Sequence, residues 1–196
     1  MSQAGVALRR RSGWRLGLTL PRTDPEVAAR TLKRHLHEFW INRSLAKKGW
    51  TRQPLDDLHV VVSIPATRAD GAKDDYYVHL GAEYYDVYPA TVLLVVPDQG
   101  WSRARAGSPW WPKLKPPGWF GLHDDYEYRD PQSGALLHKG QLVCFSMGAE
   151  YYVSNHAPTD EQRWQQGRHT VAATLSRLSE VLSQPYYEGP DAPRNP

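Results

Sequence analysis

Three runs of β-branched and aromatic residues decide the fold of this chain: LHVVVSI at residues 58–64, YYVHLGAEY at 76–84 and TVLLVV at 91–96. Residues of these types favour extended strands, and a turn pair, Asp70-Gly71, lies between the first two runs. The third run has no polar break, which is typical of a strand that is buried on both faces. The sequence therefore predicts an antiparallel meander of three strands.

A helix is predicted before the meander, over residues 25–48. Asp24 offers a side-chain oxygen that can cap a helix, and Pro25 follows at a position where a helix tolerates proline. Apolar residues then recur at helical spacing up to Trp40. Gly49 supplies a stop after two lysines, so the helix is expected to end there.

A second helix is predicted after the meander, over residues 160–183. Thr159 and Gln162 have the spacing of a capping box, an apolar stripe follows, and Pro185 ends the segment. Between meander and helix, the apolar run LVCFSM at 142–147 suggests a last strand or an extended segment of an active site. The fold class expected from this order of elements is α+β.

The composition is that of a folded protein without a disulfide framework. The chain has 196 residues, 40% of them hydrophobic, and one cysteine. Its longest strongly apolar run, residues 90–96, is far too short to cross a membrane, and residues 1–20 lack the apolar core of a secretory signal. We therefore expect a cytoplasmic protein with no membrane contact.

Residues 97–120, rich in Pro and Trp, are expected to form an irregular loop that packs over the body.

Basic residues are concentrated at the start of the chain. Residues 1–50 carry eleven basic and three acidic side chains, whereas residues 51–196 carry thirteen basic and eighteen acidic ones. The first predicted helix holds six of the cations: Arg30, Lys33, Arg34, Arg43, Lys47 and Lys48. Such a face can be simply solvated, can bind nucleic acid, or can dock an acidic protein surface. We expect protein docking through Arg30, Lys33 and Arg34, with nucleic acid the less favoured partner.

The layout resembles the ubiquitin-conjugating-enzyme-like (UBC-like) family, in the form of a divergent bacterial-style member. The resemblance rests on Tyr88-Pro89 before the third strand, on Cys144 after a Gly-containing approach at Gly140, and on the helix that leads into Pro185. It extends over a domain at residues 24–190, with a basic N-terminal arm at 1–23 and a flexible tail at 191–196. The resemblance implies a UBC-like α+β fold with an N-terminal helix, an antiparallel meander and a C-terminal helix.

The resemblance also implies a function centred on Cys144. A member of this family would hold the C-terminus of a ubiquitin-like modifier as a thioester on Cys144 and pass it to an amine of a target protein. It would receive the modifier from an activating enzyme, which the first helix commonly contacts. The alternative is a catalytically inactive UBC-like module that binds a ubiquitin-like protein or another partner. Exposure of Cys144 in a groove would favour the enzyme, and burial would favour the module.

This chain departs from the family pattern before Cys144. The family's His-Pro-Asn tripeptide is absent, and the corresponding stretch reads GALLHKG at 134–140. His138 is the candidate that would orient the thioester or receive a proton, with His123 and His156 as further candidates. These histidines match no metal-binding spacing, and no nucleotide-binding or serine-hydrolase motif is present, so neither a metal nor a cofactor is expected.

Overall fold

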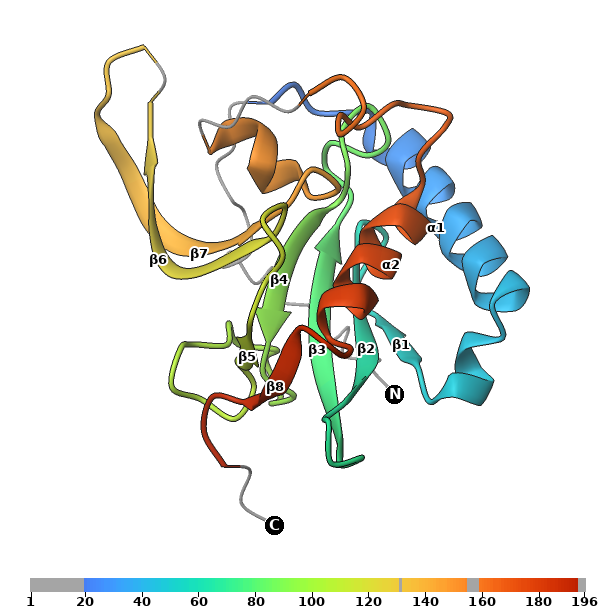
Figure 1. The fold of residues 1–196 in the computed structure, drawn as a ribbon. Coiled ribbons are helices and arrows are strands. Elements are labelled where there is room, and N and C mark those ends of the chain that lie inside the picture. Colours follow the sequence, from blue (N-terminus) through green and yellow to red (C-terminus); the bar gives the residue numbers. More distant parts are fainter. Residues whose placement is uncertain (1–19, 131, 155–158, 194–196) are drawn as a thin grey trace, which may run out of the picture.

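An antiparallel sheet of four strands forms the centre of the computed structural model, which describes residues 20–130, 132–154 and 159–193. The strands are β1 (Thr51–Pro54), β2 (His59–Thr67), β3 (Lys73–Gly81) and β4 (Thr91–Val95), and they lie side by side in sequence order (Figure 1). The predicted meander is confirmed as β2, β3 and β4. The preceding strand, β1, was not predicted, because its four side chains are all exposed and give no apolar pattern.

Both faces of this sheet are buried. Val60, Val62 and Ile64 of β2 face the main core, which also contains the buried residues of both α-helices in the described part of the chain. Val61 points the other way and packs with Leu93 and Val95 in a separate cluster. All five residues of β4 are buried, which confirms the prediction of a strand covered on both sides.

The first helix, α1, spans Pro25–Asn42 and begins where the sequence predicted. The Asp24 carboxylate accepts hydrogen bonds from the backbone N–H groups of Glu26 and Val27, at 3.0 and 3.1 Å. The prediction that this helix continues to residue 48 is wrong. The chain turns at Ser44, whose φ is 50°, and residues Leu45–Lys48 form a separate 3-10 helix, η1, which ends at Gly49 with φ of 83°.

The second helix, α2, spans only Val171–Val181, so the predicted start at residue 160 is also wrong. Thr159 closes a single turn, in which its carbonyl accepts the N–H groups of Gln162 and Arg163. The chain then leaves the helical path, because Trp164 is bound through its backbone N–H to the Tyr152 hydroxyl. The cap of α2 is Thr170, whose side chain accepts the N–H of Ala172.

A long hairpin projects from the sheet (Figure 1). It consists of β6 (Gly121–Arg129) and β7 (Leu136–Cys144), and a 3-10 helix, η2 (Ala149–Val153), follows it. The apolar run at 142–147 predicted only the last residues of β7, since the rest of the hairpin is polar and mostly exposed at its far end. The described residues thus form an α+β fold with a four-stranded antiparallel sheet and two α-helices.

The Trp-rich segment packs on the body, as expected. Trp101 and Trp110 both contact the ring of Tyr77, and Trp111 is buried in the main core. This segment is irregular except for β5 (Pro112–Leu114), which pairs with the C-terminal strand β8 (Tyr187–Pro190).

Residues 1–19 of the expected basic arm and residues 194–196 of the expected tail lie outside the described residues.

The side chain of Gln141 joins the hairpin to the sheet. It is fully buried, accepts the backbone N–H of Leu94 at 2.6 Å and donates to the carbonyl of Leu94 at 3.2 Å. The same amide nitrogen donates to the carbonyl of Ala104 at 3.0 Å. One side chain therefore provides, between β7 and β4, the kind of bonds that a backbone ladder provides elsewhere.

Candidate functional site

Cys144 ends β7 at the base of the hairpin, opposite Gly121. Its side chain is only 6% exposed and lies in a cluster with Tyr128 and Leu142, against which Tyr126, Tyr151 and Val153 pack. Burial raises the pKa of the Cys144 thiol to about 11, and this effect outweighs the opposing hydrogen bond of Ser154. At pH 7 a thiol of this pKa is ionised in about one molecule in ten thousand.

His138 and Cys144 occupy opposite ends of the same strand. Six residues of extended chain separate them, which corresponds to about 20 Å. The His138 ring instead stacks on Tyr128, with ring centroids 4.5 Å apart. Of the other candidate histidines, His156 lies outside the described residues, whereas His123 lies near Cys144. A methyl group built on Gly121 would be 3.2 Å from His123 Nε2 and 3.5 Å from Cys144 Cβ.

The cations of the first helix form an exposed stripe. Arg30, Lys33 and Arg34 are all exposed on α1, and no ion pair with another described residue engages them. Arg43, Lys47 and Lys48 follow the end of α1 in the chain, so they do not lie on that helix as predicted, and they are likewise exposed. All six predicted cations are therefore exposed to solvent.

A groove of about 410 Å³ lies next to this stripe, between α1 and the start of α2. Glu38, Asn42 and Arg43 line one wall, and Arg168 and His169 lie on the other. Arg34 is one helical turn from Glu38, so the cationic stripe and the groove adjoin. The groove thus presents several cationic or polar groups and one carboxylate.

A buried tyrosine fixes the two helices beside this groove. The Tyr85 hydroxyl accepts the N–H of Val171, the first residue of α2, at 2.8 Å. It also lies within hydrogen-bond distance, 2.6 Å, of Nδ1 of His35 on α1. Burial lowers the pKa of His35, and the charge of Arg34 lowers it further, which favours the neutral imidazole; Arg34 Nη2 lies 3.3 Å from its Nε2.

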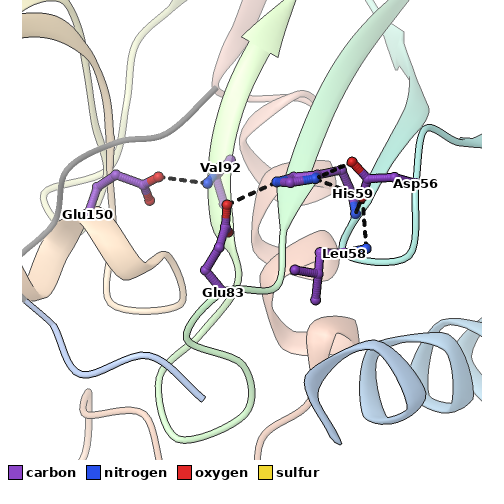
Figure 2. A network of polar contacts seen from close by, with 6 residues as sticks. All are labelled: Asp56, Leu58, His59, Glu83, Val92 and Glu150. Carbon is purple, nitrogen blue, oxygen red and sulfur yellow. Dashed lines mark hydrogen bonds and ion pairs between the residues drawn. The ribbon is translucent and has the colours of Figure 1, made fainter. Parts of the chain in front are cut away.

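A second polar network, which sequence reasoning missed, lies at the start of β2 (Figure 2). His59 Nδ1 is 2.8 Å from an Asp56 oxygen, and His59 Nε2 is 2.9 Å from a Glu83 oxygen. Burial would lower the pKa of His59, but the hydrogen bonds and charges of Glu83 and Asp56 outweigh it and raise the pKa. The His79 ring stacks on His59 at 5.1 Å, and burial lowers the pKa of His79 to about 4.

Glu150 is a fully buried carboxyl group at the start of η2 (Figure 2). Its Oε1 accepts the backbone N–H of Val92 at 2.8 Å, whereas Oε2 has no partner among the described residues. Burial raises the pKa of Glu150 to about 8, so this side chain is mostly protonated at pH 7. No sequence motif pointed to Glu150, because its environment comes from β4, more than fifty residues earlier.

In residues 20–130, 132–154 and 159–193, no three His, Cys, Asp or Glu side chains gather so that they could hold a metal ion. Neither of the α-helices in this part of the chain is long and apolar enough to cross a membrane. Comparison with known proteins adds no assignment, since no family model, no curated protein and no solved structure matches this chain.

Proposed function

We propose that this protein is a UBC-like binding module that docks an acidic partner protein through α1, and that it is not a thioester carrier. The observation that carries the proposal is the burial of Cys144, whose side chain is 6% exposed beneath tyrosine side chains. The order of α1, meander, Tyr88-Pro89, Cys144 and α2 supports the family resemblance. By that resemblance, the partner is a ubiquitin-like protein or an enzyme that handles one.

The chemistry of thioester formation requires an accessible thiolate. The nucleophile must reach the carbonyl carbon of the modifier, and the thiolate is the reactive form. A thiol with a pKa of about 11, covered by Tyr126, Tyr151 and Val153, meets neither requirement at neutral pH. Cys144 therefore acts as a small buried apolar residue at the base of the hairpin.

The docking surface consists of the α1 stripe and the adjoining groove. Exposed ion pairs add little to the stability of a fold, and these cations form none with described residues. Their like charges on one helix also repel each other. An acidic partner removes that repulsion and is attracted over about 8 Å at physiological ionic strength. This charge complementarity favours an acidic protein surface as the occupant.

Charge reversal tests the docking surface. The variant combines Arg30→Glu, Lys33→Glu and Arg34→Glu, and its matched control combines Lys73→Glu, Lys113→Glu and Arg163→Glu, which are exposed cations away from α1. Binding of a fluorescent decaglutamate peptide is measured by polarisation at low and at physiological salt. We expect affinity to fall at least ~10-fold in the variant, to stay unchanged in the control, and to fall with salt. Tighter binding of duplex DNA than of the peptide at physiological salt, also lost in the variant, would assign the surface to nucleic acid and overturn the proposal.

A transfer assay tests the thioester hypothesis directly. The protein is incubated with an activating enzyme, its ubiquitin-like modifier and ATP, and adducts are separated with and without a reducing agent. The proposal predicts no adduct that a reducing agent removes. Such an adduct, present in the natural sequence and lost in Cys144→Ser, would establish the conjugating enzyme instead and reject the binding module.

A further inference from the structure

Arg103 is a half-buried cation to which the described part of the chain provides no hydrogen bond and no ion pair. Burial lowers the pKa of its guanidinium, and the charge of Arg105 lowers it further. Removing a cation from water without an anionic partner is costly, because nothing in the protein replaces its hydration. A charge held in this way within a folded protein suggests a ligand of the opposite sign.

The backbone around Arg103 is firmly held. The N–H of Val96 donates to the carbonyl of Ser102 at 2.7 Å, and the N–H of Ala104 donates to the carbonyl of Leu94 at 2.9 Å. The residues on either side of Arg103 therefore run along the free edge of β4. Since Gln141 also binds the carbonyl of Ala104, this segment lies directly between β4 and β7. The position of Arg103 over β7 is thus set by the fold.

The side chain of His138, a residue of β7 itself, ends close to Arg103. A methyl group built on Gly140 would be 3.0 Å from Arg103 Nη1 and 3.6 Å from His138 Cδ2, so the ends of both side chains lie together over Gly140. The stacking of His138 on Tyr128, with an interplanar angle of 11°, fixes the plane of the imidazole. Its Nε2 is buried and has no hydrogen-bond partner among the described residues. A neutral imidazole can carry its proton on that nitrogen and donate it.

We propose that Arg103 and His138 together bind a phosphate group over Gly140. The guanidinium can donate two parallel N–H bonds to two phosphate oxygens, and His138 Nε2–H can donate to a third. Glycine at position 140 lets the two side chains lie this close to the strand, because a methyl group there would be only 3.0 Å from Arg103 Nη1. Asp124, whose charge also acts on Arg103, is paired with Arg105 at 3.3 Å, which reduces its repulsion of an anion. The site is distinct from the α1 surface and from Cys144, so it does not depend on the proposed function.

The test is a titration of the full chain with inorganic phosphate, followed through the NMR signals of the His138 ring. We expect a saturable change at His138 and a rise of its pKa on binding, because an adjacent dianion favours the imidazolium. In Arg103→Met the apparent dissociation constant should rise at least ~10-fold, since the charge-assisted bonds are lost. The matched control is Arg129→Met, which removes an arginine that lies on the β6–β7 hairpin and is paired with Glu127, and it should leave the titration unchanged.

A second variant keeps the test valid if Arg103→Met fails to fold. Gly140→Ala retains both side chains, but its methyl group would be only 3.0 Å from Arg103 Nη1 and so displaces the flexible end of Arg103 from its place beside His138. We expect it to weaken phosphate binding at least ~10-fold as well. O-phosphoserine distinguishes the sources: binding of inorganic phosphate alone indicates a free anion, whereas binding of both indicates a phosphate carried by a larger molecule. No saturable response at His138, or a response that persists in both variants, would overturn the proposal.

Discussion

His59 carries a positive charge in the folded protein for geometric reasons. Both of its ring nitrogens lie within 2.9 Å of carboxylate oxygens, of Asp56 and of Glu83. Carboxylates only accept hydrogen bonds, and a neutral imidazole has only one N–H, so both contacts require the imidazolium. The charged ring in turn lowers the pKa of Glu83 and of Asp56, against the effect of their burial.

Replacement of His59 by Gln should therefore have a pH-dependent effect on stability. A group whose pKa is raised on folding stabilises the fold fully below its unfolded pKa, and this contribution is lost as the pH rises through the folded pKa. The two carboxylates contribute above their unfolded values of 3.8 and 4.5. The loss in His59→Gln should thus be largest near pH 5.5, at about 2 kcal/mol, and smaller at pH 8.5. Urea unfolding at both pH values checks this, and an equal loss at both would contradict it.

Glu150 should oppose folding as the pH rises. Its pKa is raised from 4.5 to about 8 by burial, so between these values the folded chain keeps a proton that the unfolded chain has released. The free energy of unfolding should then fall by about 1.4 kcal/mol per pH unit from this group alone. Glu150→Gln, which resembles the protonated form, should remove this slope. The measurement is the difference in stability between the two proteins at pH 5.5 and pH 7.5, and a difference that does not change with pH would refute the assignment.

Among the structural elements, the junction between β4 and β7 depends on one side chain. Gln141→Ala should leave the N–H of Leu94 and the carbonyl of Ala104 without their buried partner. An unsatisfied buried polar group costs about 1–3 kcal/mol, so the total loss should be about 3 kcal/mol. The control is Gln132→Ala at the exposed tip of the hairpin, which should change stability by less than about 0.5 kcal/mol. Chemical denaturation measures the stability of both variants. Equal losses would show that contacts other than those of the Gln141 side chain hold β7 against β4.

The elements that the sequence predicted correctly are those with strong local signals. The start of α1 at Asp24 and the strands β2, β3 and β4 were predicted from capping groups and apolar runs. The false helix start at Thr159 has an equally good local signal, but the contact of Trp164 with Tyr152 and a positive φ at Gly167 prevent its extension. The exposed strands β1 and β6 gave no signal, since they do not alternate between core and solvent.

At the level of the whole molecule, the candidate site depends on contacts between distant parts of the chain. The exposure of Arg30, Lys33 and Arg34 on the first helix was predicted, whereas Arg43, Lys47 and Lys48 were assigned to the same helix and lie beyond its end. The chemical state of Cys144 could not be predicted, because the side chains that cover it come from β6 and from η2. The hydrogen bond between His59 and Glu83 and the close approach of Arg103 to Gly140 bring together residues from separate parts of the chain, which no local pattern reveals.

The contribution of the C-terminal strand β8 to the free energy of unfolding should be measurable. The Tyr187 hydroxyl in β8 donates to the Asp74 carboxylate of β3 at 2.6 Å, and the same carboxylate accepts two bonds from Arg68. Tyr187→Phe should therefore lower the free energy of unfolding by about 2 kcal/mol. Tyr186→Phe alters a neighbouring ring whose hydroxyl forms no hydrogen bond with a described residue, and it should leave the free energy of unfolding within about 0.5 kcal/mol. A thermal or urea transition of each variant provides the measurement, and the prediction fails if the two are equally stable.

The projecting hairpin implies that amide protons of one element exchange with solvent at very different rates. Near its base, Leu142 and Val143 are fully buried, and the Gln141 side chain fixes this end to the sheet. Toward its tip, Leu136 and Leu137 are about half exposed, and the backbone bonds there connect only β6 with β7. Opening of the tip therefore exposes little apolar surface, whereas opening of the base disrupts the main core. Deuterium should enter the hairpin from its tip under native conditions, and the amides around Leu142 should exchange only when the whole molecule unfolds.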